Sequence, residues 1–194
     1  MTRILLFDLG GVLIDNQMFP DLQSMMDDPE DIPRLKHRWV RSPAVSQFEA
    51  GRITFDSFFD KLREEFGLTL SHDDFLTRFR TWPSGYFDGA LDLLDALRPN
   101  HTLCCLSNSN EIHWQGEFTE PFTHVFSSHL IGHFKPEPGA FDHVIRELDC
   151  AAEDISFFDD ADINVEAAKN LRLKAYHTPD FPTLQQTLRN IGLL

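Results

Sequence analysis

The chain lacks long hydrophobic runs and has few cysteines. Its longest uninterrupted apolar segments, such as Ile4–Phe7 and Leu103–Leu106, contain four residues, whereas a membrane-spanning helix needs about 20. No apolar leader follows Met1, so we expect neither a signal peptide nor a membrane anchor. Of the 3 cysteines, two are adjacent and none belongs to a CxxC pair, which excludes a disulfide framework and argues against a thiolate zinc site. We expect a cytoplasmic protein with reduced, buried thiols.

Basic residues are also scarce. The chain has 17 Lys and Arg against 31 Asp and Glu, a formal net charge of −14. Such a charge repels nucleic-acid phosphates and anionic lipids, so we expect no nucleic-acid partner and no membrane partner. An anionic small molecule remains possible as a substrate if a local metal ion holds it. Aromatic packing should rely on phenylalanine, because the chain has 18 Phe and 2 Tyr.

Short β-prone segments alternate with helix-periodic segments over much of the 194 residues. In residues 138–148, for example, Phe141, Val144, Ile145 and Leu148 fall on one helical face. This alternation predicts an α/β fold with a doubly wound, Rossmann-like parallel sheet. The predicted strands are Ile4–Phe7, Thr102–Leu106, His124–Phe126, Ile155–Phe158 and Lys174–His177, and the predicted helices between and after them are Tyr86–Leu97, Pro138–Leu148, Asn164–Leu171 and Thr183–Ile191.

Residues 17–85 carry helical signals and no strand-like run. Thr54 is placed to cap a helix rich in phenylalanine, and Gly67 is placed to end it. We therefore predict an α/β core domain, residues 1–16 and 86–194, with a small all-helical cap domain inserted at 17–85. The helices predicted in the insert are Pro33–Val40, Pro43–Ala50, Phe55–Phe66 and Ser71–Trp82.

Polar residues follow four of the five predicted strands, where parallel sheets bind their ligands. Each residue alone has an ordinary structural explanation as a turn, a helix cap or a solvated helix start. All of them together at one edge of one sheet indicate a site. The residues are Asp8 with Gly10 and Gly11, Ser107 with Asn108, Lys135, and Asp159 with Asp160 and Asn164.

Such a set suits phosphate chemistry. Carboxylates without a neutralising arginine favour a hard divalent cation, and Mg²⁺ binds to one or two carboxylates together with substrate phosphate. A carboxylate can also attack phosphorus and form an aspartyl-phosphate. A lysine, a hydroxyl group, a side-chain amide and glycine-rich backbone can then donate hydrogen bonds to phosphoryl oxygens.

The same residues lie in segments that resemble the motifs of the haloacid dehalogenase-like hydrolase superfamily, in the family's order and over essentially the whole chain. The helical insert falls where members with a four-helix cap carry it. Residues 49–53 and 66–71 resemble the cap of a bacterial subgroup of sugar-phosphate phosphatases that includes α-D-glucose-1-phosphate phosphatase. The four matching segments are FDLGGVL at 7–13, LSNSN at 106–110, KPEPGAF at 135–141 and FFDDADINVEAA at 157–168.

The resemblance implies a metal site. Asp8 matches the nucleophile, which is also a Mg²⁺ ligand, and Gly10 matches the position whose backbone carbonyl binds the metal. Asp160 matches the acidic metal ligand. Asp159 and Asn164 match groups that orient metal-bound water.

The resemblance also implies a phosphate site. Ser107 and Asn108 match the donors to phosphoryl oxygens, and Lys135 matches the lysine that stabilises the charge. Gly10 and Gly11 match the turn whose backbone approaches the phosphate. The implied enzyme is a Mg²⁺-dependent phosphoric monoester hydrolase that acts on a small phosphorylated metabolite, as a monomer or a homodimer.

One position departs from the family pattern. Most phosphatases of the superfamily have an aspartate two residues after the nucleophile, as general acid and base, and here Gly10 occupies that place. Asp15 is a candidate replacement, although a role as a hinge or linker residue explains it equally well. The missing acid predicts a preference for acidic leaving groups, such as those of sugar 1-phosphates. Two alternatives remain: a metal-independent 2-haloacid dehalogenase and a catalytically idle binding protein.

Overall fold

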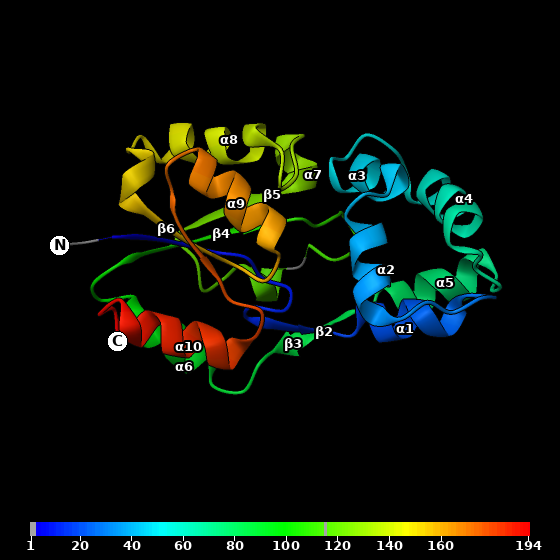
Figure 1. Ribbon diagram of the computed structural model, residues 1–194, viewed down its shortest axis with the longest axis horizontal. Coiled ribbons are helices and arrows are strands. Elements are labelled where there is room, and N and C mark those ends of the chain that lie inside the picture. The colour runs from blue at the N-terminus through cyan, green and yellow to red at the C-terminus, as the bar shows by residue number, and fades with distance from the viewer. Residues whose placement is uncertain (1–2, 115) are drawn as a thin grey trace.

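A five-stranded parallel sheet forms the centre of the protein in the computed structural model, which describes residues 3–114 and 116–194 (Figure 1). The order β5-β4-β1-β6-β7 places the first strand in the middle. Every pair is parallel, so all carboxyl ends lie at one edge. The fold-class prediction is therefore confirmed. The strands are β1 (Ile4–Phe7), β4 (Thr102–Ser107), β5 (His124–Ser127), β6 (Ile155–Asp159) and β7 (Lys174–His177).

Helices cover both faces of this sheet (Figure 1). Side chains alternate along β1, so that Leu5 and Phe7 join one hydrophobic cluster and Leu6 joins the other. Cys104 and Cys105 divide in the same way and are buried free thiols, as predicted. The helices are α6 (Ala90–Leu97) and α10 (Phe181–Asn190) on one face, with α7 (Ser128–Ile131), α8 (Pro138–Leu148) and α9 (Asp162–Asn170) on the other, and two 3₁₀ turns lie at Gly116–Phe118 and Ala152–Asp154.

Five further helices pack around their own hydrophobic cluster beside the carboxyl edge of the sheet (Figure 1). Thr54 caps one of them by accepting a hydrogen bond from the Ser57 backbone N–H, and Gly67 ends it with a φ of 65°, both as predicted. Phenylalanine dominates this cluster, and Phe75 contacts Phe59 with 5.3 Å between ring centroids. The helices are α1 (Met18–Met25), α2 (Ile32–Trp39), α3 (Pro43–Glu49), α4 (Phe55–Phe66) and α5 (His72–Phe79).

A small antiparallel ribbon joins the two parts of the molecule. It pairs β2 (Ile14–Asn16) with β3 (Pro83–Tyr86). The prediction that residues 17–85 contain no strand is wrong for residues 83–85. They belong to β3, which pairs with β2 where the chain returns from the five helices. Residues 83–86 could not be recognised locally, since their partner strand lies about 70 residues earlier in the sequence. Helices α1 and α7 were also not predicted.

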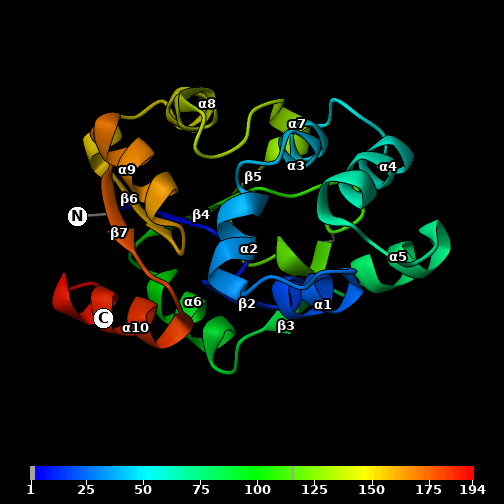
Figure 2. The ribbon, with the colours of Figure 1, turned by 45° about the vertical axis from the view of Figure 1, so that its right-hand side comes forward.

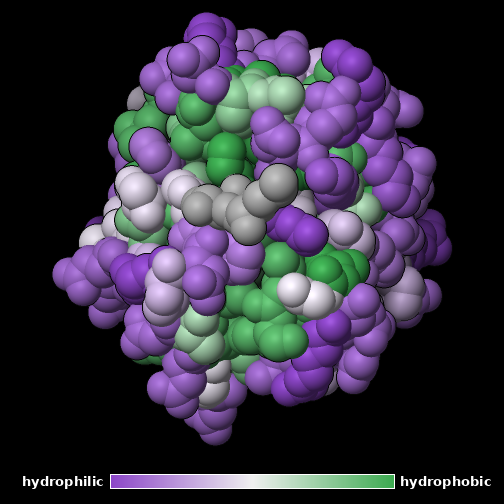
Figure 3. Space-filling view, turned by 90° about the vertical axis from the view of Figure 1, so that its left-hand side faces the viewer, coloured by the Kyte–Doolittle hydropathy of each residue, from purple (hydrophilic) through white to green (hydrophobic). Residues whose placement is uncertain are grey.

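Hydrophilic and apolar residues share the surface on the side away from the five helices. Figure 3 shows apolar areas above and below the grey atoms, bordered by hydrophilic residues. No helix within residues 3–114 and 116–194 is long and apolar enough to cross a membrane.

The phenylalanine cluster should carry much of the stability of the helical part. Phe75 is fully buried, so Phe75→Ala should lower the free energy of unfolding by about 3–5 kcal/mol through lost burial and a residual cavity. Leu91→Ala, at a leucine that is 48% exposed, is the control. Urea denaturation measures both, and equal stability of the two variants would contradict the packing described.

Candidate active site

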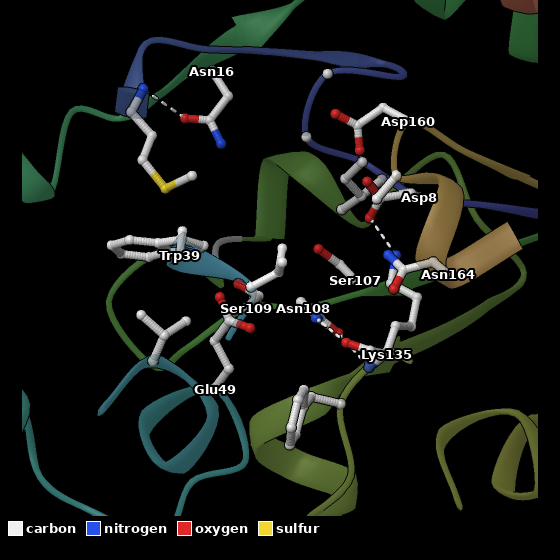
Figure 4. A pocket seen from close by; sticks show the side chains of 18 of the residues that line it. Asp8, Asn16, Trp39, Glu49, Ser107, Asn108, Ser109, Lys135, Asp160 and Asn164 are labelled. Atoms are coloured by element: carbon white, nitrogen blue, oxygen red, sulfur yellow. Dashed lines mark hydrogen bonds and ion pairs between the residues drawn. The ribbon is translucent and has the colours of Figure 1, made fainter. Parts of the chain in front are cut away.

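The polar residues predicted from the strand ends do meet at one edge of the sheet. Asp8, Ser107 and Asp159 stand at or directly after the ends of β1, β4 and β6. A cavity of about 520 Å³ opens between this edge and the helices α2 and α3. It is lined by nearly all the predicted residues, namely Asp8, Gly10, Gly11, Ser107, Asn108, Lys135, Asp160 and Asn164 (Figure 4).

A buried lysine joins two of the carboxylates. Lys135 Nζ donates to Asp8 Oδ1 and to Asp159 Oδ2, each at 2.7 Å. Burial alone would lower the pKa of Lys135, but the charges of Asp159 and Asp8 raise it above its usual range. The ammonium group therefore stays charged and holds both carboxylates in place.

Asp159 is a positioning residue at the bottom of the site. It is completely buried, and its Oδ1 accepts hydrogen bonds at 2.9 Å from the Ala161 backbone N–H and from Asn164 Nδ2. Its two oxygens are thus committed to the start of α9 and to Lys135. These hydrogen bonds fix the Asp159 carboxylate relative to Lys135 and to the start of α9.

Two hydrogen bonds hold Lys135 from the other side. Asn108 Nδ2 donates to the Lys135 carbonyl at 2.8 Å, and the Lys135 backbone N–H donates to Asn108 Oδ1 at 2.7 Å. The loop after β4 is itself held by Ser128, whose hydroxyl bonds both the N–H and the carbonyl of Ser109. The segments at 107–109 and 135 therefore form one rigid unit, although 27 residues separate Asn108 from Lys135.

The donor set fits a divalent cation. Asp8, Asp159 and Asp160 each offer an oxygen within 4.8 Å of the others. The pKa of Asp8 is raised to about 7 and that of Asp160 to about 6, in each case chiefly by burial and in addition by neighbouring carboxylates. Positive charge lowers both values, from Lys135 for Asp8, and from Lys36 and Lys135 for Asp160. A cation beside Asp8 and Asp160 would relieve this repulsion.

The glycine turn places backbone against these carboxylates. Gly11 has a φ of 80°, and a Cβ there would lie 2.9 Å from Asp160 Oδ2. A side chain at Gly11 would therefore displace Asp160. The Gly11 backbone N–H donates to the Ile14 carbonyl at 2.8 Å, so the Gly11 amide contributes to the turn rather than facing a ligand.

Asp15 lies apart from the other predicted residues. It belongs to the β2–β3 ribbon and is not among the residues that line the cavity. Its carboxylate accepts hydrogen bonds from Gln17 Nε2 at 2.9 and 3.0 Å. The structure therefore gives Asp15 the linker position that sequence analysis considered as its alternative role.

Glu49 is a cavity residue that sequence analysis did not select. It is the last residue of α3 and lines the cavity together with Trp39 of α2 (Figure 4). Burial raises the pKa of Glu49 to about 7, while Lys135 lowers it. Glu49 begins the segment 49–53 that resembles a phosphatase cap, but that resemblance assigns it no role, and a glutamate near a helix end is usually a solvated side chain.

Three contacts connect the five helices to the sheet domain. A Cβ at Gly51 would lie 2.5 Å from the His129 carbonyl oxygen, and Arg52 donates to the Gly132 carbonyl at 3.0 Å. On the other side of the cavity, His113 Nε2 lies 2.7 Å from the Phe79 carbonyl. Helices α3 and α7 accordingly lie next to each other (Figure 2).

Comparison with known proteins agrees with this geometry. Residues 2–172 match the family described as haloacid dehalogenase-like hydrolase. The chain belongs to the haloacid dehalogenase-like hydrolases. The predicted family, its Rossmann-like fold and the prediction of a hydrolase are thereby confirmed.

Relatives of this hydrolase cover nearly its whole length. D-ribitol-5-phosphate phosphatase of Bacteroides thetaiotaomicron is 22% identical over 204 residues, covering 97% of each chain. Sesquiterpene phosphatase astK of Aspergillus oryzae is 26% identical over 197 residues, covering 96% of this chain and 94% of that protein.

A solved structure of the HAD family enzyme BT-2542 from Bacteroides thetaiotaomicron, in complex with magnesium and inorganic phosphate, is similar with a TM-score of 0.70. It is 26% identical and covers 91% of this chain and 94% of that one. The predicted Mg²⁺ agrees with the ions in that structure.

The lysine bridge gives a stability test. Lys135→Met would leave the Asp8 and Asp159 carboxylates buried without a counter-charge, so the free energy of unfolding should fall by about 3–5 kcal/mol. Adding Asp159→Asn removes one of the two stranded charges and should restore part of the loss. Chemical denaturation of the metal-free protein measures both variants, and a Lys135→Met protein as stable as the parent would contradict the role described for the bridge.

Proposed function

We propose that this hydrolase is a Mg²⁺-dependent phosphatase of small phosphomonoesters, with Asp8 as the nucleophile. The supporting observation is the bridge from Lys135 to Asp8 and Asp159, with Asp160 next to it and a cavity of about 520 Å³ in front. The two phosphatase relatives, which span nearly the whole chain, support the same reaction class.

In this proposal Asp8 attacks with the oxygen that Lys135 does not hold. Lys135 bonds Oδ1, so Oδ2 is directed to phosphorus, and the P–O ester bond breaks as the aspartyl-phosphate forms. The Ser107 hydroxyl and the second amide hydrogen of Asn108 donate to phosphoryl oxygens. Ser107 is held by its place at the end of β4, and Asn108 by its two hydrogen bonds to the backbone of Lys135. Because these donors are in position before the substrate binds, little reorganisation is needed during the reaction.

Asp8, the Gly10 carbonyl and Asp160 would hold Mg²⁺, with Asp159 and Asn164 orienting this group. When bound, the ion neutralises charge on the phosphoryl group and on the carboxylates. Asp159 is suited to orientation because both of its oxygens already accept hydrogen bonds.

Residues 17–85 would act as the cap domain that selects the substrate. Their helices supply the cavity wall opposite the sheet, with aromatic and polar side chains mixed, including Phe19, Lys36, Trp39 and Ser46. A cavity of about 520 Å³ has room for a small organic ester. The relatives act on a polyol phosphate and on a sesquiterpene compound by their names. We propose a sugar or polyol phosphate, because Lys36, Ser46 and Glu49 of the helical wall could bind hydroxyl groups beside the aromatic side chains.

A screen of phosphate release tests the proposed function. The purified protein, freed of metal and then supplied with Mg²⁺, should release phosphate from a panel of sugar, polyol and alkyl phosphates, and chelation should abolish the release. Asp160→Asn should require far more Mg²⁺ for the same rate. Halide release from 2-haloacids without metal, and no phosphate release, would identify a dehalogenase. Ligand binding without either reaction would identify an idle binding protein.

Removal of the nucleophile is a separate test. Asp8→Asn retains the side-chain shape but removes the attacking oxygen and one charge, so kcat should fall by about 10⁴-fold or more. Asp92→Asn, the same change at an exposed position of α6, should have no effect. Substantial activity in Asp8→Asn would show that water attacks phosphorus directly.

A further inference from the structure

Position 10 has no acidic side chain. A Cβ at Gly10 would lie 3.2 Å from Asn16 Nδ2, so a side chain there would need a small shift of Asn16, which also lines the cavity. If the protein is a phosphatase, another group has to give a proton to the leaving oxygen and take one from water.

We propose that Glu49, carried by the cap helix α3, is the general acid and base of the reaction. The inference rests on the proposed phosphatase function and names the residue that replaces the missing acid. Its carboxylate points into the cavity from the side of the helices, towards Asn108 and Ser109 (Figure 4). An in-line leaving group departs away from Asp8, and Glu49 lines the cavity from α3, whereas Asp8 lines it from the end of β1.

The surroundings of Glu49 allow both proton-transfer steps. The pKa of Glu49 is raised to about 7, chiefly by burial and in addition by the charge of Asp8, while the charge of Lys135 acts to lower it. Both the protonated and the ionised form are therefore populated near neutral pH, as a residue that acts first as an acid and then as a base requires.

The position of Glu49 is set by the contact between cap and core. Two residues further on, Gly51 packs against the His129 carbonyl so closely that a Cβ would lie 2.5 Å from it. Arg52 donates to the Gly132 carbonyl at 3.0 Å and lies 3.7 Å from the Glu137 carboxylate. The end of α3 is thus fixed to the core on the side where Glu49 enters the cavity.

The reaction takes two steps, and Glu49 transfers a proton in each. In the first, Asp8 Oδ2 bonds to phosphorus, the P–O ester bond breaks, and the leaving oxygen takes the proton of Glu49 to depart as an alcohol. In the second, the Glu49 carboxylate takes a proton from water, whose oxygen bonds to phosphorus as the P–Oδ2 bond breaks. Inorganic phosphate leaves, Asp8 is again a carboxylate, and Glu49 is again protonated.

Dependence on the leaving group tests this role. Glu49→Gln keeps the size of the side chain and removes the proton. For an alkyl phosphate, kcat/KM should fall by about 10²–10³-fold, whereas for p-nitrophenyl phosphate, whose leaving group needs no proton, it should change by about threefold or less. Since water also loses its base while the first step with p-nitrophenyl phosphate stays fast, the Glu49→Gln enzyme should accumulate phosphorylated Asp8 with this substrate after rapid quenching.

Glu64→Gln is the matched control, because Glu64 is an exposed glutamate of the same cap, on α4. It should behave as the parent with both substrates. In Glu49→Ala, added acetate should restore part of the turnover of the alkyl phosphate, an effect that a merely misfolded cap would not give.

Three results would overturn the inference while leaving the proposed function intact. The first is a Glu49→Gln enzyme with unchanged kcat/KM for both substrates. The second is an equal loss of kcat/KM with both substrates and no phosphorylated Asp8 after quenching. The third is a dependence on the leaving group that appears in Asp15→Asn and not in Glu49→Gln. Absence of phosphate release by the parent enzyme from every ester tested would overturn the proposed function itself.

Discussion

A single buried ammonium group organises the carboxyl edge of this sheet. Lys135 Nζ bridges Asp8 and Asp159 at 2.7 Å each, in a chain whose formal net charge is −14. Without Lys135, the ends of β1 and β6 would bring two carboxylates together in a region of low dielectric constant, where the repulsion is expensive. The loops around Lys135 are built to keep it there, through Asn108 and through Ser128 behind it.

The bridge also leaves the site with unbalanced negative charge. Lys135 bridges only two of the three carboxylates Asp8, Asp159 and Asp160, and burial holds the pKa of Asp8 and of Asp160 well above the ordinary value of an aspartate. Perturbed carboxylates of this kind cluster at functional sites. A ligand that brings positive charge would relieve their repulsion.

The sheet and the five helices α1–α5 contribute differently to the site. The sheet holds charges at fixed positions, while the helices form a wall whose rigidity comes from stacked phenylalanines, such as Phe48 on Phe58 with 4.3 Å between ring centroids. The cap reaches the site through few polar groups, and Glu49 and Lys36 are the charged ones that act on its carboxylates. The chemistry would thus depend on how firmly α3 sits on α7.

The sequence by itself determined the five parallel strands, most helices and the approximate location of Asp8, Ser107, Lys135 and Asp160. Strand and helix periods are local, and parallel topology brings all strand ends to one edge. Only the tertiary structure decided which groups face each other. Asp159 accepts hydrogen bonds from Lys135 and Asn164. Asp15 lies in the β2–β3 ribbon and does not line the cavity, whereas Glu49 does. Burial and charge pairing arise between segments distant in sequence, and no local pattern carries that information.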